Sequence, residues 1–317
     1  MTTWGIVSTI KAPARDILNF AAYHLDRGAH RLYLYLDAPE QMVFDQLKAH
    51  PKIKVVACDD TWWAKRKGRP DKHQSRQFVN ARHAYNRRVE VDWLAHIDVD
   101  EFLWPATPLD QQLTALPDDC LCARVRPIEA LAPAPSDSGP LTTFKAFHLD
   151  PNDRRRAAEH VFPTFGQYLS GGFLSHVAGK LFYRTGIAGL QVKIHNLTVN
   201  DVQNPGERPL AETELCHMHA QSWEDWQRSY RYRMTKGSYR AELKPQVNRG
   251  SGGLSLHQLF AMIESEHGEA GLRAFHDEVC VAHPATCARL QAEGLLRRHD
   301  LALDAARARH FSNTPDQ

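Results

Sequence analysis

Residues 91–97 have the sequence VDWLAHI and are followed directly by the acidic run DVDE, which ends at Glu101. The apolar side chains of the first segment are typical of a buried β-strand, because a strand covered on both faces is hydrophobic along nearly its whole length. The strand is predicted to end where Asp98 begins the polar segment. A buried strand that ends in carboxylates is typical of the sheet edge at which α/β proteins bind ligands.

Strand-like and helix-like segments alternate before this point. Three segments rich in β-branched and aromatic residues are predicted strands: 5–10, 31–36 and 53–57. Three segments with apolar residues at helical spacing are predicted helices: 14–27, 42–49 and 75–89. This alternation indicates right-handed crossovers between parallel strands. We therefore expect an α/β fold, Rossmann-like, with a mostly parallel sheet flanked by helices.

The rest of the chain is less regular. Three further strands are predicted: 121–126, 180–184 and 190–195. The proline-rich segment 127–140 should be a loop, because proline interrupts helices and central strands. From residue 222 the pattern is helical, with a flexible hinge at 250–253. We therefore expect an α/β domain at residues 1–220 and a mainly helical C-terminal extension at 221–317.

The composition is that of a globular protein of 317 residues, with 43% hydrophobic and 24% charged residues. The formal net charge of +2 and the lack of a nucleic-acid-binding motif argue against a nucleic-acid partner. We expect no signal peptide and no transmembrane segment, since no apolar run is long enough. The six cysteines form no C-x-x-C pair, so we expect reduced core thiols and a cytoplasmic protein.

The four N-terminal strands each end with, or are followed by, residues that could bind a ligand. These candidates are Thr9, Lys11, Asp37, Asp60 and Asp98. In an open parallel sheet, ligands bind outside the carboxyl ends of the strands. Aspartate is also common in turns and at helix N-termini, so each aspartate taken alone has a structural explanation as well.

Asp98 and Asp100 are predicted to bind a divalent metal ion. On extended backbone leaving a strand, side chains separated by one residue point to the same side. Two carboxylates held together repel each other unless a cation lies between them. Mg²⁺ or Mn²⁺ prefers such oxygens and can take phosphate oxygens in its remaining positions. The alternative is a solvated acidic turn.

An ordered set of segments resembles the GT-A-fold glycosyltransferases. The run DWLAHIDVDEF at 92–102 resembles the D-x-D segment of their family 2-like and family 92-like group. Three more segments resemble that group's opening helix and second strand, its glycine–lysine segment and its histidine-containing segment: 17–35, 179–195 and 215–226. The likeness spans roughly residues 4–240. The ordered set is more specific than any single piece.

The resemblance implies that residues 1–220 form a catalytic domain that binds a nucleotide-sugar. A UDP-linked sugar would be transferred to a saccharide or glycolipid hydroxyl, in the assembly of a surface polysaccharide. Asp98 would lie near the ribose and the metal, and Asp100 would coordinate Mn²⁺ or Mg²⁺. Asp37 and Thr9 would line the pocket for the base. The metal, as a Lewis acid, would neutralise charge on the departing diphosphate.

The resemblance also implies a histidine ligand for the metal. The candidates are His195, His217 and His219. In the family a tyrosine follows the first histidine of this segment, but here Met218 follows His217 and is itself followed by His219. The resemblance therefore does not decide which of these two histidines would bind the metal. Each of the three could equally be a structural histidine.

An inverting transfer needs a general base, which in family 2 enzymes is an acidic residue beyond the D-x-D segment. Glu224 and Asp225 have this form, and Glu129 and Glu159 are alternatives. Acidic residues are also favoured in the first turn of a helix, so a surface pair is a second explanation for the first two. Inversion itself rests on the resemblance alone.

The basic run at 65–88 has three interpretations. It could be a solvated loop and helix face. It could be a lid near the diphosphate, with Lys72 as a contact and with Trp62 and Trp63 as packing or sugar-stacking surfaces. A nucleic-acid patch is the third interpretation, which the near-zero net charge disfavours. Lys180, in the glycine–lysine segment, is the better single candidate for a phosphate contact.

Two functions of other classes remain open. One is a metal-dependent phosphoesterase, and the other is a non-catalytic nucleotide- or carbohydrate-binding protein on the same scaffold. The C-terminal helices could grip the acceptor, dimerise or touch a membrane surface, and their apolar positions suit packing on the core equally well. The sequence does not define the oligomeric state.

Overall fold

The structure, a computed structural model, describes residues 1–317 except 88, 136–138, 248–252 and 312–317. Contacts within the chain divide it into two compact units. Unit 1 comprises residues 1–126, 178–215 and 302–317, and unit 2 comprises residues 127–177 and 216–301. The chain therefore passes between the units several times, whereas the sequence predicts a single division at residue 220.

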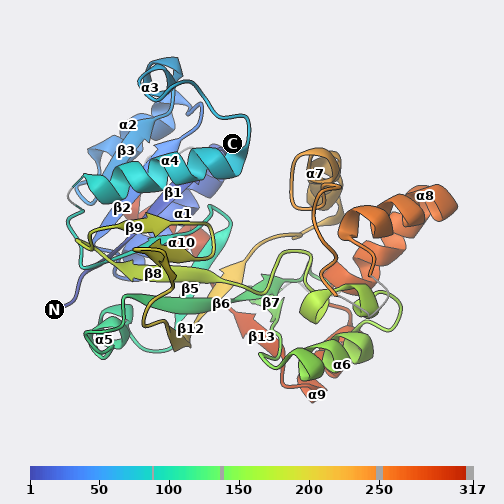
Figure 1. The fold of residues 1–317 in the computed structure, drawn as a ribbon. Helices are drawn as coiled ribbons and strands as arrows, with labels where there is room; N and C mark the ends of the chain where they lie inside the picture. The colour runs from blue at the N-terminus through green and yellow to red at the C-terminus, as the bar shows by residue number, and fades with distance from the viewer. Residues whose placement is uncertain (88, 136–138, 248–252, 312–317) are drawn as a thin grey trace. The chain divides into compact units, whose positions relative to one another are not determined.

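Unit 1 is built on a sheet whose first four strands are parallel. They are β1 (Trp4–Ile10), β2 (Arg31–Leu36), β3 (Ile53–Ala57) and β4 (Trp93–His96), in the spatial order β3-β2-β1-β4. Antiparallel β8 (Lys180–Arg184) pairs with β4, and the first half of β6 (Cys122–Ala130) pairs with β8. The helices between the parallel strands are α1 (Ala14–Asp26), α2 (Gln41–Ala49), α3 (Asp60–Ala64) and α4 (His73–Asn86). The predicted α/β fold with a mostly parallel core sheet is confirmed and is consistent with a GT-A-like fold (Figure 1).

Burial explains why these segments form a sheet covered on both sides. Every residue of β1 is buried, as is every residue of β2 after the first. In Figure 1, α4 covers one face of the parallel strands and α1 lies on the other. The helix α1 ends shortly before Gly28, whose φ of 94° favours glycine and stops the helix, as its sequence predicts.

Further elements of unit 1 lie outside this group of six strands. β5 (Glu101–Pro105) pairs with β12 (Arg208–His217), and α5 (Leu109–Thr114) follows β5. β9 (Leu190–Val192), β10 (Leu197–Val199) and β11 (Val202–Gln203) form a separate antiparallel sheet. The predicted strand at 190–195 is therefore confirmed only for its first half. The chain turns after it, where the N–H of Lys193 donates to the carbonyl of Asn196 at 2.8 Å.

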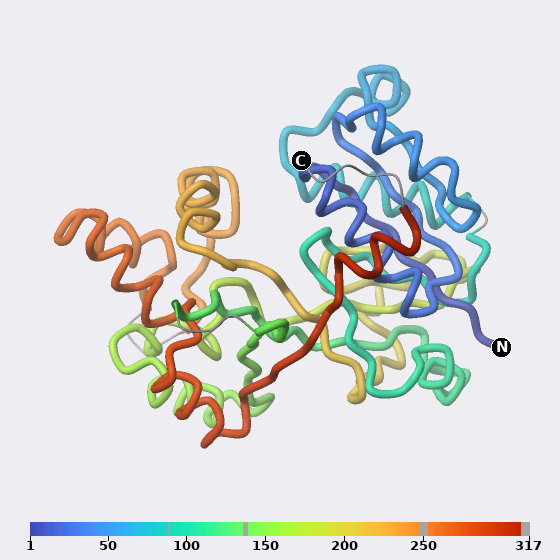
Figure 2. Tube along the Cα trace, turned by 180° about the vertical axis from the view of Figure 1, so that it is seen from behind, coloured from blue at the N-terminus to red at the C-terminus, as the bar shows by residue number. Residues whose placement is uncertain are grey.

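The C-terminal helix α10 (Leu303–His310) belongs to unit 1, although the sequence places it in the C-terminal extension. It lies beside α1 (Figure 2). Arg307 donates to Asn19 at 2.8 Å, and both Arg309 and His310 contact the carboxylate of Asp26. Polar contacts between segments so far apart in the chain leave no local signal in the sequence.

Unit 2 combines a small antiparallel sheet with helices. The second half of β6 pairs with β7 (Thr142–Lys145), which pairs with β13 (Leu296–His299). The helices are α6 (Pro151–Val161), α7 (Trp223–Thr235), α8 (Leu256–Cys280) and α9 (Pro284–Ala292), with 3-10 turns η1 (Gly166–Tyr168) and η2 (Ser170–Gly172). Trp226, Phe260 and Phe275 pack ring against ring in its core. The C-terminal region is mainly helical as predicted, apart from β13.

The prediction that residues 127–140 form a loop is wrong for the first four of them. The strand β6 continues through Pro127 to Ala130. Pro127 lies between the pairing with β8, which ends at Val125, and the pairing with β7, which begins at Glu129. Neither of these two registers includes Pro127, although β6 also pairs with β12. Of the predicted hinge at 250–253, all but Gly253 lies outside the described residues.

Two predictions from composition concern the chain as a whole. No helix in the described ranges is both long enough and apolar enough to span a bilayer. All six cysteines are buried thiols, as predicted.

His24 of α1 should make the stability of the protein depend on pH. Its ring is fully buried, with Nδ1 at 2.8 Å from the carbonyl of Phe20 and Nε2 accepting from the N–H of Leu103 at 3.4 Å. Burial lowers the pKa of His24 to about 3. The unfolded chain binds a proton near pH 6.5 and the folded chain does not, so stability falls as the pH falls below that value. We expect this residue to lower the free energy of unfolding by about 1–2 kcal/mol between pH 6.5 and pH 5.

Urea unfolding of wild type and His24→Gln at both pH values measures this effect. The variant should lose less stability on acidification than wild type, whereas His30→Gln, at an exposed position, should behave as wild type. An equal pH dependence in wild type and His24→Gln would contradict the expectation.

Candidate functional site

The ends of β1, β2 and β4 meet at the point where the strand order reverses. β2 and β3 lie on one side of β1, and β4 lies on the other. Ligands of open α/β sheets bind at such a switch point. Three of the predicted residues reach this edge: Thr9 near the end of β1, Asp37 directly after β2, and Asp98 after β4.

One face of α4 holds all three strand-end residues. The contacts are Asn80 Nδ2 donating to Thr9 Oγ1 (3.1 Å), Arg76 Nε beside Asp37 Oδ2 (3.5 Å), and Gln77 Nε2 donating to Asp98 Oδ1 (2.5 Å). The helical positions 76, 77 and 80 are neighbours on the helix surface. The strand ends and the helix therefore form one connected polar cluster.

Asp37 is buried, with 2% of its side chain exposed. Arg69 Nη2 donates to both carboxylate oxygens, at 2.8 and 2.7 Å. A buried carboxylate needs such partners, because an unpaired charge is costly in the interior. Arg69 lies between α3 and α4, so this contact also fixes the connecting segment to the end of β2.

Lys180, the first residue of β8, places its ammonium between two carboxylates. Its Nζ lies 2.6 Å from Asp98 Oδ2 and 3.2 Å from Glu101 Oε2. Only 2% of the Lys180 side chain is exposed, against 35% for Asp98. Burial alone would lower the pKa of Lys180, but the two carboxylates raise it above its ordinary value. Burial alone would raise the pKa of Asp98, but the charge of Lys180 holds it below its usual range, so both groups are ionised at neutral pH.

Residues 98–101 form a turn, and the expectation of extended backbone through the D-x-D segment is wrong. The N–H of Glu101 donates to the carbonyl of Asp98 at 3.1 Å, and the N–H of Asp98 donates to Glu101 Oε2 at 2.8 Å. The pairing of β4 with β1 ends at His96, and β5 begins at Glu101. Asp100 lies half-buried in this turn. Strand alternation therefore does not set the directions of the two aspartates.

The charges of Asp98 and Lys180 affect the pKa values of two nearby histidines. His96, in β4, is 3% exposed, and neither of its ring nitrogens has a hydrogen-bond partner among the described residues. Burial, followed by the charge of Lys180, lowers the pKa of His96 to about 4. Burial also lowers the pKa of His73, at the start of α4, against the opposing effect of Asp98. Each imidazole is neutral at pH 7 and can donate one hydrogen bond and accept another.

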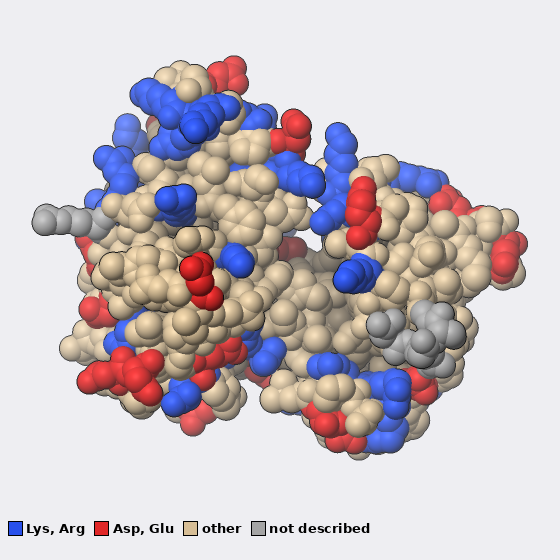
Figure 3. Space-filling model, in the orientation of Figure 1, with Lys and Arg blue, Asp and Glu red and all other residues tan. Residues whose placement is uncertain are grey.

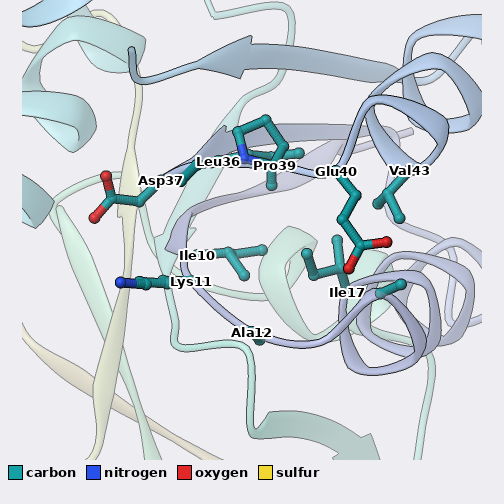
Figure 4. Close-up of a pocket in the computed structure, with 11 residues that line it drawn as sticks. Ile10, Lys11, Ala12, Ile17, Leu36, Asp37, Pro39, Glu40 and Val43 are labelled. Atoms are coloured by element: carbon teal, nitrogen blue, oxygen red, sulfur yellow. The ribbon is translucent and has the colours of Figure 1, made fainter. Parts of the chain in front are cut away.

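A pocket opens beside the same edge, between the ends of β1 and β2 and the first turns of α1 and α2. Lys11 and Asp37, both predicted to bind the nucleotide, line it together with Ile10, Ile17 and Glu40. In Figure 4 the side chains of Lys11 and Asp37 point to one side, away from Ile17 and Glu40. The pocket therefore has a polar side next to the cluster and a mainly apolar remainder.

The other predicted nucleotide-binding residues lie at helix starts. Asp60 is the first residue of α3 and is exposed. Lys72 is the exposed N-cap residue of α4, and its side chain makes no capping hydrogen bond. That Asp60 and Lys72 bind the nucleotide-sugar remains a prediction.

The predicted metal ligands are divided between the units. Asp98, Asp100 and His195 belong to unit 1, and His217 and His219 belong to unit 2. Within the described ranges, no three His, Cys, Asp or Glu side chains form a group suited to a metal ion. The Mn²⁺ or Mg²⁺ ion remains a prediction.

The three histidines each contact other groups of the protein. His195 Nδ1 lies 3.0 Å from the carbonyl of Gly179. His219 Nε2 lies 3.1 Å from the hydroxyl of the buried Tyr239, and its ring centroid lies 5.1 Å from that of His217. These contacts are compatible with the structural role that the sequence leaves open for each.

Glu224 and Asp225, the predicted general bases, lie exposed in the first turn of α7 in unit 2. The N–H of Asp225 donates to Ser222 Oγ at 3.1 Å, and the Ser222 hydroxyl donates to the Asp225 carboxylate at 2.9 Å. Arg228 also donates to Asp225 at 2.9 Å. This is the helix-start arrangement that acidic residues favour. Catalytic roles for the two residues remain predictions.

The two alternative bases are also in unit 2. Glu129 is buried, and its carboxylate accepts from the N–H groups of Leu174 and Ser175 and lies 3.2 Å from Lys145 Nζ. Glu159 is exposed on α6.

The basic run contributes two cations to the site. Arg69 and Arg76 contact Asp37, while other basic side chains gather over α3 and the segment after it (Figure 3). Trp63 is 2% exposed, and Trp62 Nε1 donates to Asn80 at 3.3 Å. The sequence leaves packing and sugar stacking open for these two tryptophans. Their contacts favour packing.

Sequence reasoning missed the polar face of α4. Gln77, Asn80, Ala81 and Ala84 are its buried residues. In the sequence, Gln77 and Asn80 share one helix face with Ala81 and Ala84. This spacing is the signal that could have predicted that the two polar residues face the strand ends. The sequence shows Glu101 and His96 only as members of the run DWLAHIDVDEF at 92–102, and it predicts no role for either of them.

No family model matches the sequence, and no curated protein matches it. Among solved structures, the chain is similar to HddC from Yersinia pseudotuberculosis, with 12% identity and a TM-score of 0.28 over 42% of this chain and 64% of that one. It is similar to the glycosyltransferase GlyE of Streptococcus pneumoniae TIGR4, with 18% identity and a TM-score of 0.26 over 39% and 30%. It is also similar to the galactosyltransferase LgtC in complex with donor and acceptor sugar analogues, with 13% identity and a TM-score of 0.28 over 57% of each chain.

The matched region spans less than two thirds of each of these three chains. Two of the three are glycosyltransferases by name. With TM-scores this low the likenesses carry no argument, and the assignment depends on the side chains of the site.

Proposed function

We propose that the chain is a glycosyltransferase that uses a nucleoside-diphosphate sugar, UDP-linked in our prediction, as its donor. The cluster at the switch point carries the proposal. Arg69, Arg76 and Lys180 bring three positive charges to the edge of a parallel sheet where carboxylates also gather. Such an edge supplies acceptors for base and ribose hydroxyls and cations for a diphosphate.

The pocket and the cluster suggest how the donor divides between them. The base would enter the pocket beside Lys11 and Asp37, whose walls are mainly apolar. The partly exposed carboxylate of Asp98 would accept hydrogen bonds from the ribose. Arg76 and His73, at the start of α4, would face the diphosphate, since the N-terminus of a helix also favours anions.

The reaction would replace one bond at the anomeric carbon by another. The acceptor hydroxyl oxygen forms a bond to that carbon, and the bond from the carbon to the diphosphate oxygen breaks. The nucleoside diphosphate leaves with the electron pair, and a general base takes the hydroxyl proton. Glu224 and Asp225 stay our candidates for that base, with inversion as the expected outcome. The acceptor would be a saccharide or glycolipid of a surface polysaccharide.

A divalent ion, if bound, would supply positive charge to the departing diphosphate. Asp98 does not fit as its ligand, because the ammonium of Lys180 lies 2.6 Å from Oδ2 and would repel a second cation there. Asp100 remains the predicted ligand. We therefore assign no step of the transfer to the ion.

Binding of nucleoside diphosphates tests the proposal. UDP, GDP, ADP, CDP and TDP are added in turn, and the thermal unfolding midpoint is recorded with EDTA and with Mn²⁺. A ligand at 100 times its dissociation constant should stabilise the protein by about 2.7 kcal/mol. Products from a mixture of nucleotide-sugars and saccharide acceptors are then identified by mass spectrometry.

Asp98→Asn should lower the transfer rate at least about 100-fold while the protein stays folded, because the variant loses an oriented charge at the donor site. Asp45→Asn, at an exposed position of α2, is the matched control and should transfer as wild type. Release of phosphate without an acceptor would favour the phosphoesterase instead. Nucleotide binding with no product would favour the non-catalytic binding protein, and no nucleotide response at all would refute donor binding.

A further inference from the structure

The buried carboxylates of the site already have cationic partners. Asp37 is held by Arg69 at 2.7 Å and by Arg76 at 3.5 Å. Asp98 and Glu101 share the ammonium of Lys180. In a D-x-D site the carboxylates are expected to face a divalent ion, whereas here a side chain of the protein itself supplies the positive charge.

A divalent ion at Asp98 would have to compete with this arrangement. Gln77 donates to Oδ1 at 2.5 Å, and Lys180 lies 2.6 Å from Oδ2. An ion at a coordination distance of about 2.1 Å from Oδ2 would lie within about 5 Å of the ammonium. Lys180 is 2% exposed, so the repulsion between the two cations would be poorly screened.

We propose that the ammonium of Lys180 is the resident cation of this site and that the nucleoside diphosphate binds without a divalent metal. This inference rests on the proposed function and specifies how its donor is bound. Lys180 holds Asp98 in one orientation, so that this partly exposed carboxylate can accept ribose hydroxyls. Lys180 is then a positioning residue as well as a source of charge.

One buried side chain next to the Asp98–Lys180 pair has no hydrogen-bond partner of its own among the residues that the structure describes. Both ring nitrogens of His96 lack a hydrogen-bond partner within the described part of the chain, whereas Nε of Arg76 lies 3.5 Å from Asp37 Oδ2. Such groups are rare in folded proteins, because leaving them unpaired costs free energy. Both side chains contact or electrostatically influence the groups around Asp37, Asp98 and Lys180.

The first test compares binding of UDP to the wild-type protein in EDTA and in Mn²⁺, by isothermal titration calorimetry. The proposal predicts dissociation constants that agree within about twofold, since no ion takes part. UDP binding seen only with Mn²⁺ would overturn the proposal and leave the proposed function intact. No UDP binding in either buffer would overturn this proposal, and the proposed function would be overturned as well only if GDP, ADP, CDP and TDP also fail to bind. This comparison requires no variant.

The second test removes the ammonium. Lys180→Ala should weaken UDP binding in EDTA by about 30-fold or more, the effect expected when one partner of a buried charge pair is truncated. It should also leave Asp98 and Glu101 without their shared cation, and the variant should therefore bind Mn²⁺ where wild type does not. Electron paramagnetic resonance of added Mn²⁺ measures this directly.

Lys54→Met, an exposed lysine in β3, is the control and should bind UDP as wild type. Circular dichroism establishes whether Lys180→Ala is folded. If it is not, Mn²⁺ resonance of the wild-type protein still decides: an ion bound in wild type and lost in Asp98→Asn would contradict the proposal, and no bound ion supports it.

Discussion

Gly179→Ala should destabilise the protein by at least about 3 kcal/mol, through a backbone clash next to the site. Gly179 has a φ of 71°, which side chains of L residues rarely adopt, and a Cβ added to it would lie 2.0 Å from the carbonyl oxygen of Val125. Val125 pairs with Lys180, the next residue, so neither backbone can move without breaking the ladder between β6 and β8. Urea unfolding of the variant measures the loss.

Gly186→Ala is the matched control. Gly186 has a φ of 75°, and nothing lies within 4 Å of an added Cβ. Only the conformational cost of about 1–2 kcal/mol is expected there. Equal losses in the two variants would mean that the clash with Val125 is relieved at no cost. The glycine of the glycine–lysine segment would then have no structural requirement beyond its positive φ.

The core strands could be predicted because their signals are local. The strands β1 and β4 are buried along their whole length, and a charged residue follows each within two positions. Parallel order then follows from the intervening helices, and it brings Thr9, Asp37 and Asp98 to one edge. The position of these three residues therefore follows from the hydrophobic pattern of the strands and from the helices that connect them.

The partners of these residues could not be predicted in the same way. The contact of Lys180 with Asp98 joins positions 82 residues apart, and that of Asn80 with Thr9 joins positions 71 apart. Which charged side chains meet depends on how β8 and α4 lie on the sheet. For Lys180 the sequence predicts a contact with phosphate, but the structure gives its ammonium two carboxylates of the protein.

Pairings across long stretches of chain also escaped prediction. The strand β6 contains a proline and pairs with three strands, β8, β7 and β12. Proline is a reliable break signal only where its N–H would be needed, and here it lies between the residues that pair with β8 and those that pair with β7. The return of α10 to α1 depends on contacts such as Arg307 with Asn19, which a helical pattern cannot reveal.

Lys145→Met should destabilise the protein by about 3–5 kcal/mol. Lys145 is 1% exposed, and its Nζ lies 3.2 Å from Glu129 and donates to the carbonyls of Gly172 and Val279 at 2.6 and 2.8 Å. Burial raises the pKa of Glu129, but the charge of Lys145 and further contacts lower it to about 2. Methionine would fill much of the space yet leave a buried carboxylate without its cation. Urea unfolding at pH 7 measures the loss.

Two comparisons separate the lost charge from the lost packing. Lys54→Met removes an exposed lysine, 3.9 Å from Glu90, and should cost no more than about 1 kcal/mol. In wild type, the lowered pKa of Glu129 contributes stability that is complete above about pH 4.5 and is lost as the pH falls towards 2. In Lys145→Met, Glu129 has no ammonium partner, so protonation of its carboxylate at low pH breaks no ion pair. The difference in stability between the two proteins should therefore shrink between pH 7 and pH 3.5. An unchanged difference would mean that contacts of the lysine stem, and not its charge, stabilise unit 2.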